Sequence, residues 1–433
     1  MKKYILIILC CLTSFPLWSY NVNMIVEHYS VDQGLPNNTV NCTLKDRDGF
    51  IWFGTWYGLC CFDGVKFKTF NKQEHDSDVP PRKIQRIVED KNGYIWVKTI
   101  DRKLYVFNKV TECFHAVYDD MKNYSENIQV IKLQNTAEGD VLLLTKDKNL
   151  LLAGVDEKGQ VTIKILFDSR DEINKHDYTL KHHVLCETEE YISWIGTDYK
   201  VSAVHKGAEL ASRPADFITS KINSGDKDSF TSFFEDGRKV WVGDRAGIFY
   251  SIDVRTGLVN RYVLSEIKGA ISNLLVTPAG YVYLSVAGQG TYEYDLAERR
   301  LQKINTEMND AMVTHAFIDQ YDKIWFHENE KALIYYDPLN HTAKRFPFTM
   351  FGKITTLYSE DAGERGLFFL SPAGEAWLFD REHVEMVYIN KLKQLSNDRA
   401  NQQFYHLMLD NDGVLWLSSA DEGVYCMNFP KKQ

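Results

Sequence analysis

Residues 40–70 read VNCTLKDRDGFIWFGTWYGLCCFDGVKFKTF. The segment alternates short runs of β-branched and aromatic residues with Asp-Gly and Tyr-Gly pairs, which are typical of tight turns. Four short strands joined by such turns would form one small antiparallel sheet. The whole chain has 13% aromatic residues, a bias toward side chains that are favoured in strands. This stretch therefore predicts an all-β protein.

The same pattern recurs along the chain. Residues 90–97 repeat the turn and second strand as DKNGYIWV, and residues 410–417 repeat them as DNDGVLWL. One central residue marks each unit, and successive markers lie 42 to 52 residues apart: Trp52, Trp96, Leu142, Trp194, Trp241, Tyr283, Trp325, Phe368 and Trp416. Four strands in such a period are typical of a β-propeller blade, which buries its faces against its neighbours. We therefore expect about nine four-stranded blades with the markers packed between them.

The two ends of the chain indicate how the ring closes. The last repeat has strands at residues 403–409, 414–418 and 423–429, whereas residues 24–29 form a spare strand before the first repeat. If the N-terminal strand completes the last blade, no sheet edge stays exposed. The alternative is a seven-bladed ring followed by the first two blades of a second ring.

The first twenty residues resemble a secretory signal peptide, and residues 21–433 then form the propeller. Lys2 and Lys3 precede an apolar run at residues 4–12, and Ser19 is a small residue suited to cleavage. No other stretch approaches the length of a transmembrane helix. We therefore expect an exported protein, periplasmic or extracellular, with no membrane span in the mature chain.

Charge and cysteine content narrow the partners further. A net charge of −9 disfavours binding to nucleic acid. The cysteines have irregular spacing and lie in apolar strand patterns, so we expect buried thiols, with one bridge from Cys42 to Cys60 or Cys61 as the alternative.

The first repeat also resembles a known family. HYSVDQGLPNNTV at residues 28–40, DGFIWFGT at 48–55 and Gly58-Leu59 closely resemble the two-component regulator propeller repeat. The resemblance implies a periplasmic sensor region of a hybrid two-component system of the kind found in Bacteroides-type bacteria, which typically detects oligosaccharides. Family members continue into an immunoglobulin-like domain, a membrane span and a histidine kinase, which this sequence lacks. The resemblance implies either the front part of such a receptor or a separate propeller that works with a membrane-bound histidine kinase or another copy of itself.

The sequence gives no sign of catalytic chemistry. It has no G-x-S-x-G elbow, Walker loop or dinucleotide fingerprint. The turns at residues 46–49 and 410–413 lack the remaining ligands of a calcium loop, so hairpin turns are the better interpretation. We expect no enzyme, no catalytic residues, no metal and no cofactor. The alternatives are a propeller lyase or glycosidase, or an envelope scaffold that binds other proteins.

Ligand contacts are expected on the face that carries the turns between second and third strands and the connections between blades, because loops on a rigid scaffold are free to vary. Aromatic faces can stack on sugar rings, while charged and amide groups bond hydroxyls. The candidates in these turns are Trp56, Tyr57, Asp101, Arg102, Tyr199, Asp244, Arg245 and Gln289.

Overall fold

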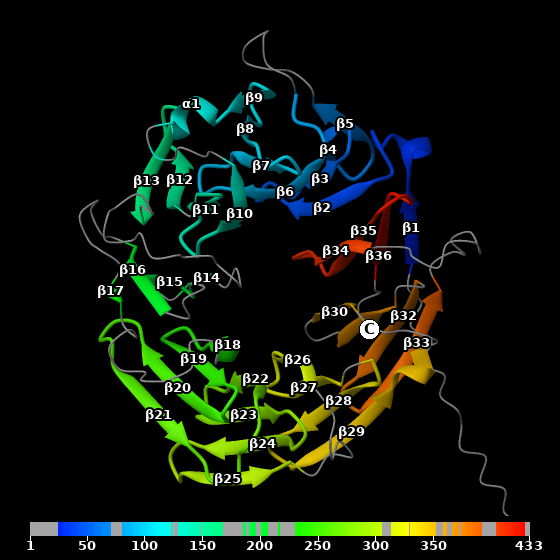
Figure 1. Ribbon diagram of the computed structural model, residues 1–433. Helices are drawn as coiled ribbons and strands as arrows, with labels where there is room; N and C mark the ends of the chain where they lie inside the picture. The colour runs from blue at the N-terminus through cyan, green and yellow to red at the C-terminus, as the bar shows by residue number, and fades with distance from the viewer. Residues whose placement is uncertain are drawn as a thin grey trace, which may run out of the picture.

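The computed structural model describes residues 25–70, 80–122, 124, 129–147, 149–167, 185–187, 190–195, 201–206, 215–216, 230–304, 313–328, 330–351, 358–361, 366–371, 374–391 and 404–428. These residues form nine four-stranded antiparallel sheets arranged as the blades of a ring (Figure 1). We name the strands of each blade A to D from the axis outward. The prediction of an all-β propeller with nine blades is confirmed.

Blades 1 to 8 each use four consecutive strands. Blade 1 consists of β2 (Val40–Lys45), β3 (Ile51–Thr55), β4 (Gly58–Phe62) and β5 (Phe67–Phe70), and blade 2 of β6 (Ile84–Glu89), β7 (Ile95–Thr99), β8 (Leu104–Asn108) and β9 (Cys113–Ala116). Blade 3 consists of β10 (Val130–Asn135), β11 (Val141–Thr145), β12 (Leu150–Val155) and β13 (Val161–Phe167), and blade 4 of β14 (Leu185–Glu187), β15 (Tyr191–Ile195), β16 (Val201–His205) and β17 (Ala215–Asp216). Blade 5 consists of β18 (Phe230–Glu235), β19 (Lys239–Asp244), β20 (Ile248–Asp253) and β21 (Val259–Val263), and blade 6 of β22 (Ile271–Val276), β23 (Tyr281–Val286), β24 (Gly290–Asp295) and β25 (Arg300–Lys303). Blade 7 consists of β26 (Val313–Ile318), β27 (Ile324–Glu328), β28 (Ala332–Asp337) and β29 (Thr342–Pro347), and blade 8 of β30 (Tyr358–Asp361), β31 (Leu367–Leu370), β32 (Glu375–Asp380) and β33 (Glu385–Lys391).

Blade 9 is completed from the other end of the chain. Its inner strands are β34 (Phe404–Leu409), β35 (Val414–Ser419) and β36 (Val424–Asn428), and its outer strand is β1 (Ile25–Tyr29). β1 pairs antiparallel with β36 along its whole length. The short 3-10 turn η1 (Val31–Gln33) then leads into blade 1. Closure of the ring by the N-terminal strand is therefore confirmed.

The hydrophobic core lies between the blades. The B strands β3, β7 and β11 are buried along their whole length, because a neighbouring sheet covers each of their faces and the usual in-and-out alternation is lost. Outer strands such as β21 and β25 are largely exposed or half-buried.

One cluster of buried apolar side chains fills the gap at each junction between neighbouring blades of the described chain. Blade 7 packs on blade 8 in the same way as the others do, and blade 9 packs on blade 1. The nine blades therefore form one ring, and the alternative of seven blades plus two does not hold.

The core positions expected from the sequence are also confirmed. The marker tryptophans whose side chains the structure describes are buried: Trp52, Trp96, Trp241, Trp325 and Trp416. No disulfide joins the described cysteines, of which Cys42, Cys60, Cys61 and Cys426 are buried free thiols.

An aspartate holds the tryptophan of five blades in place. One oxygen of Asp46 accepts the backbone N–H groups of Asp48 and Phe50 in the turn between strands A and B, while the other accepts the indole N–H of Trp52 at 2.7 Å. The same type of contact recurs at Asp90 and Trp96, Asp236 and Trp241, Asp319 and Trp325, and Asp410 and Trp416. These aspartates are therefore turn and core residues.

Blades with another marker have a different residue at this turn. Thr136 and Thr277 take the place of the aspartate where the markers are Leu142 and Tyr283, and each threonine hydroxyl accepts one backbone N–H of its turn. Leu142 has no indole N–H to satisfy, and the Tyr283 hydroxyl donates instead to Glu293 at 2.8 Å. Among the blades whose turn and marker side chain the structure describes, the carboxylate occurs where an indole N–H must be satisfied.

Candidate ligand-binding face

The turns between strands B and C lie on one face of the ring together with the connections between blades, and we call this the B–C face. Backbone hydrogen bonds fasten these segments to one another. The Lys83 N–H donates to the Trp56 carbonyl at 2.9 Å, and the Ile100 N–H donates to the Lys83 carbonyl at 2.9 Å. In the same way, the Val130 N–H donates to the Arg102 carbonyl at 2.9 Å. The turns of blades 1 and 2 therefore form a rigid rim on which side chains can be displayed.

Trp56 and Tyr57 occupy the B–C turn of blade 1 and are exposed. Their accessible fractions are 40% and 63%. The Lys83 ammonium lies over the Trp56 ring, 5.1 Å from its centroid. Both rings are open to solvent and could stack on a ligand.

Asp101 and Arg102 occupy the B–C turn of blade 2 and are also exposed. Asp101 lies 3.3 Å from the Lys103 ammonium and accepts a hydrogen bond from the Thr99 hydroxyl. Arg102 has a left-handed backbone, with φ of 67°. Burial lowers the pKa of the neighbouring Lys98, and the Arg102 guanidinium charge lowers it further.

The candidates in blades 5 and 6 differ in accessibility. Asp244 is buried and accepts the backbone N–H groups of Ala246 and Ile248, both at 2.8 Å. Burial raises its pKa despite these bonds. Arg245 is exposed. Gln289 accepts the Lys268 N–H at 2.7 Å and donates to the Glu266 carbonyl, which ties its turn to the preceding connection.

The described candidates thus form two groups of neighbouring turns, in blades 1 and 2 and in blades 5 and 6. Tyr199, the candidate in blade 4, lies outside the described residues. Asp244 already bonds its own turn and Gln289 the preceding connection, whereas Trp56, Tyr57, Asp101, Arg102 and Arg245 present exposed side chains.

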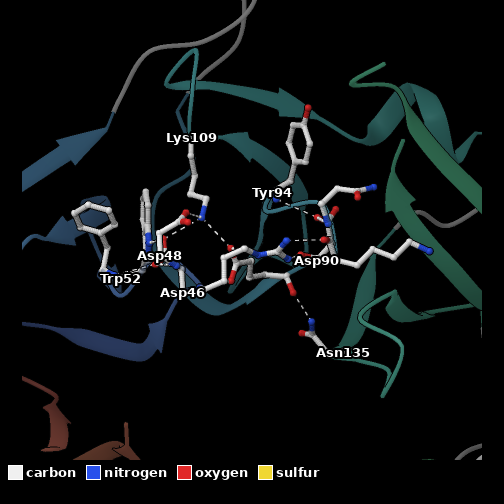
Figure 2. Close-up of polar contacts among 12 residues, drawn as sticks. Asp46, Asp48, Trp52, Asp90, Tyr94, Lys109 and Asn135 are labelled. Carbon is white, nitrogen blue, oxygen red and sulfur yellow. Dashed lines mark hydrogen bonds and ion pairs between the residues drawn. The ribbon is translucent and has the colours of Figure 1, made fainter. Parts of the chain in front are cut away.

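The opposite face carries the turns between strands A and B, and we call it the A–B face. In blades 1 and 2 these turns gather Asp46, Asp48 and Glu89, whose carboxylates lie close enough to share one cation. Figure 2 shows the Lys109 side chain reaching into this group. Its ammonium lies 3.0 Å from Asp46, 2.7 Å from Asp48 and 2.8 Å from Glu89. The lysine therefore supplies the positive charge at this cluster.

Other cations on the A–B face also join neighbouring blades. The Arg47 guanidinium of blade 1 donates to the backbone carbonyls of Asp90 and Lys91 in blade 2 and lies 3.2 Å from Glu89. Lys45 of blade 1 pairs with Asp410 of blade 9 at 3.4 Å. These contacts stabilise the junctions between blades.

The B–C face of blade 2 holds two cations that our sequence analysis missed. Arg86 of β6 lies directly opposite Lys98 of β7 in the sheet register. Lys98 is buried, with 7% of its surface accessible, and donates to the Gln85 side chain at 2.8 Å and to the Ile131 carbonyl at 2.5 Å. The signal in the sequence was a lysine at the position that is Gly54 in blade 1.

A separate pocket of about 370 Å³ lies between the outer strands of blades 2 and 3. It is lined in part by β9, β13 and the segment of the short helix α1 (Tyr118–Met121). His115 Nε2 lies 2.7 Å from Asp120 Oδ2 inside it, and Cys113 donates to the Thr111 carbonyl at 3.3 Å. Any acid–base chemistry in the described residues should be sought here as well as near the axis.

Residues 34–57 match the family described as two component regulator propeller. This chain carries a two component regulator propeller repeat. The match covers the entry into blade 1 and its first two strands, and includes the exposed pair Trp56 and Tyr57. It confirms the resemblance drawn from the sequence.

Several solved structures are similar to this chain. Two are extracellular domains from B. thetaiotaomicron attributed to the hybrid two component systems BT4673 and BT3049. They share 14% and 15% identity with the chain over 93% and 94% of its length, with TM-scores of 0.37 and 0.33. The chain spans 66% and 59% of their lengths. A streptogramin B lyase structure shares 10% identity over 94% of this chain and 98% of its own, with a TM-score of 0.40.

No protein of curated function matches the sequence. Within the described residues, no helix has both the length and the apolar character that crossing a bilayer requires.

Proposed function

We propose that this propeller is the ligand-binding region of a two-component signalling system and that it recognises an oligosaccharide in the periplasm. The observation that carries this proposal is the family repeat at residues 34–57, which places Trp56 and Tyr57 in an exposed turn. Stacked aromatic rings beside charged groups are suited to sugars, whose faces are apolar and whose edges are hydroxyls.

Signalling would require a kinase partner, and a membrane-bound histidine kinase is the partner that the repeat suggests. The same partner could be part of a longer polypeptide or a separate protein. A second copy of the propeller could also serve as a partner in relaying ligand binding. The exported location rests on the leader-like sequence at residues 1–20, which lies outside the described residues.

A glycan array followed by calorimetry tests the proposal. Binding through one or two stacked rings and a few hydrogen bonds should have a micromolar Kd, about −7 to −8 kcal/mol. Replacing Trp56 and Tyr57 by Ala should weaken it. Phe50→Ala is the matched control, since Phe50 is 42% exposed in the A–B turn of the same blade.

The nature of the product separates a sensor from an enzyme. A sensor should return its glycan unchanged. Release of shortened or unsaturated sugars, abolished by His115→Ala or by replacing a group near the axis, would instead establish a lyase or hydrolase. Capture of an envelope protein without binding to any glycan would favour a scaffold and contradict the proposal.

A further inference from the structure

Three cations gather at the B–C end of blade 2. Arg86 lies on the innermost strand β6, Lys98 lies on β7 and Arg102 lies in the turn that follows β7. Arg86 and Lys98 are register partners, so their side chains leave the same face of the sheet. Like charges directly opposite each other destabilise a sheet. The arrangement therefore carries an unfavourable interaction that an anion would relieve.

Lys98 is buried, and none of the described residues forms an ion pair with it. Its two hydrogen-bond acceptors, the Gln85 amide and the Ile131 carbonyl, are both neutral. Burial lowers the pKa of Lys98 to about 8, with further lowering by the charges of Arg102 and Arg86. An ammonium has three N–H donors, so these two acceptors leave one for another group.

The fold itself does not require a lysine here. The residue at the same register position is Gly54 in blade 1, Gly243 in blade 5 and Ser285 in blade 6. A Cβ atom added at Gly54 would meet Ile84 of the next blade at 2.6 Å. Blade 3 presents Val130 at the corresponding place.

Arg86 lies on the innermost strand of blade 2, next to the axis. Arg86 is exposed, and its charge acts on the pKa of Cys42 in blade 1 and of His406 in blade 9, where the inner strands converge. In the part of the chain that the structure describes, no carboxylate forms an ion pair with Arg86, Lys98 or Arg102. Asp101, the nearest acid along the chain, pairs with Lys103.

The site adjoins the aromatic turn of blade 1. The Lys83 backbone bonds both the Trp56 carbonyl and the Ile100 N–H, so one residue links the two B–C turns. An oxyanion held by Arg86, Lys98 and Arg102 would therefore belong to a ligand whose body could extend toward Trp56 and Tyr57.

We propose that Arg86, Lys98 and Arg102 bind an anionic group of the ligand, a carboxylate or a sulfate, so that the propeller is selective for acidic oligosaccharides. This inference rests on the proposed function for the identity of the ligand. The two guanidinium groups can each donate a pair of N–H bonds to an oxyanion, and the buried ammonium can donate one more.

The test compares acidic and neutral glycans on the same protein. Calorimetry would measure oligogalacturonate, a sulfated disaccharide, a neutral galactose oligomer of equal length and inorganic sulfate. The variants are Arg86→Gln and Arg102→Gln, both at exposed positions, with Lys98→Met as the buried change. Arg238→Gln is the matched control, because it removes one exposed positive charge from an A–B turn.

We expect at least one acidic glycan to bind and each arginine variant to weaken it by about 10- to 100-fold, the value of a charged hydrogen bond. Arg238→Gln should leave the affinity unchanged. Equal binding of acidic and neutral glycans, or acidic binding that the arginine variants do not weaken, would overturn the anion site and leave the proposed function intact.

Inorganic sulfate tests whether the anion site exists even if the oligosaccharide ligand does not. Sulfate binding that is lost in Arg86→Gln, with no glycan bound, would support the anion site and contradict the oligosaccharide ligand. If none of the four probes binds to the native protein, the anion site is overturned.

Discussion

The positively charged side chains at the two ends of blade 2 have different kinds of partners. At the A–B end, Lys109 meets three carboxylates and Arg47 meets Glu89 and backbone carbonyls, so each cation joins neighbouring turns. At the B–C end, Arg86 lies opposite Lys98, whose acceptors among the described residues, the Gln85 side chain and the Ile131 carbonyl, are neutral. The first arrangement stabilises the ring by itself. The second leaves a repulsion that a bound anion would relieve, as is common where a protein keeps a site ready for binding.

The largest effect should follow from breaking the turn at the A–B end of blade 2. Asp90 accepts the N–H groups of Asn92, Tyr94, Trp96 and Val155. Asp90→Ala would leave four donors without their acceptor and should lower the free energy of unfolding by about 3 to 5 kcal/mol. Unfolding of the native protein and of Asp90→Ala in guanidinium chloride would measure the difference in free energy of unfolding.

The matched control is Thr277→Ala in blade 6, where the hydroxyl accepts one backbone N–H, from Tyr281. It should cost about 1 kcal/mol. Equal losses for the two variants would show that the carboxylate does no more than hold its turn.

A smaller loss is expected when the cation of the A–B cluster is removed. Lys109→Met would leave Asp46 and Glu89, both largely buried, without their ammonium and should cost about 2 to 3 kcal/mol. Lys68→Met, which breaks an exposed pair with Glu112, should cost less than about 1 kcal/mol. Thermal unfolding of both variants would test the difference, and a harmless Lys109→Met would show that the cluster does not depend on its lysine.

His406 should make the stability of the protein depend on pH. It occupies in β34 the register position that Arg86 occupies in β6. Burial lowers its pKa to about 4, and the charge of Arg86 contributes. Because the folded pKa lies below the ordinary value, the unfolded chain takes up a proton first, and stability should fall as the pH drops from about 6.5 to about 4.

The expected contribution of His406 over that range is about 2 kcal/mol. His406→Asn should remove this part of the pH dependence, which melting temperatures at pH 7 and pH 5 would reveal. An unchanged difference between the two pH values would show that folding does not lower the pKa of His406.

The fold could be predicted because its signals are local and repeated. A central marker residue recurs in every blade and turn pairs such as Asp-Gly and Asn-Gly recur in several, and the spare strand at the N-terminus matches the strand missing at the other end. The contact between Asp46 and Trp52 could also have been predicted from the sequence, since the six-residue spacing between Asp and Trp recurs in blades 2, 7 and 9. The spacing alone does not show the hydrogen bond, because the turn conformation is what brings the carboxylate to the indole N–H.

The site was harder to predict because identical side chains have different uses. Asp101 follows strand B of its blade and is exposed, whereas Asp244 is the last residue of its strand B and accepts the amides of the turn. The pairing of Arg86 with Lys98 follows the hairpin register of β6 and β7, and a β-bulge at Gln85 shifts only the pair beyond it, Ile84 with Thr99. The burial of Lys98 beside the Ile131 carbonyl depends on how blade 3 packs on blade 2, which no composition or spacing rule reveals.

The smallest effect should have the opposite sign. In the ligand-free protein, Arg86→Gln would remove a repulsion with Lys98 and should stabilise the fold by about 0.2 to 1 kcal/mol, where Lys109→Met destabilises it. The gain should shrink in high salt, which screens exposed charges. It should also vanish when Lys98 is already Met, because the double variant has no repulsion left to relieve. Chemical denaturation of this double-mutant cycle would measure the coupling, and a loss of stability in Arg86→Gln alone would mean that the arginine has a structural role.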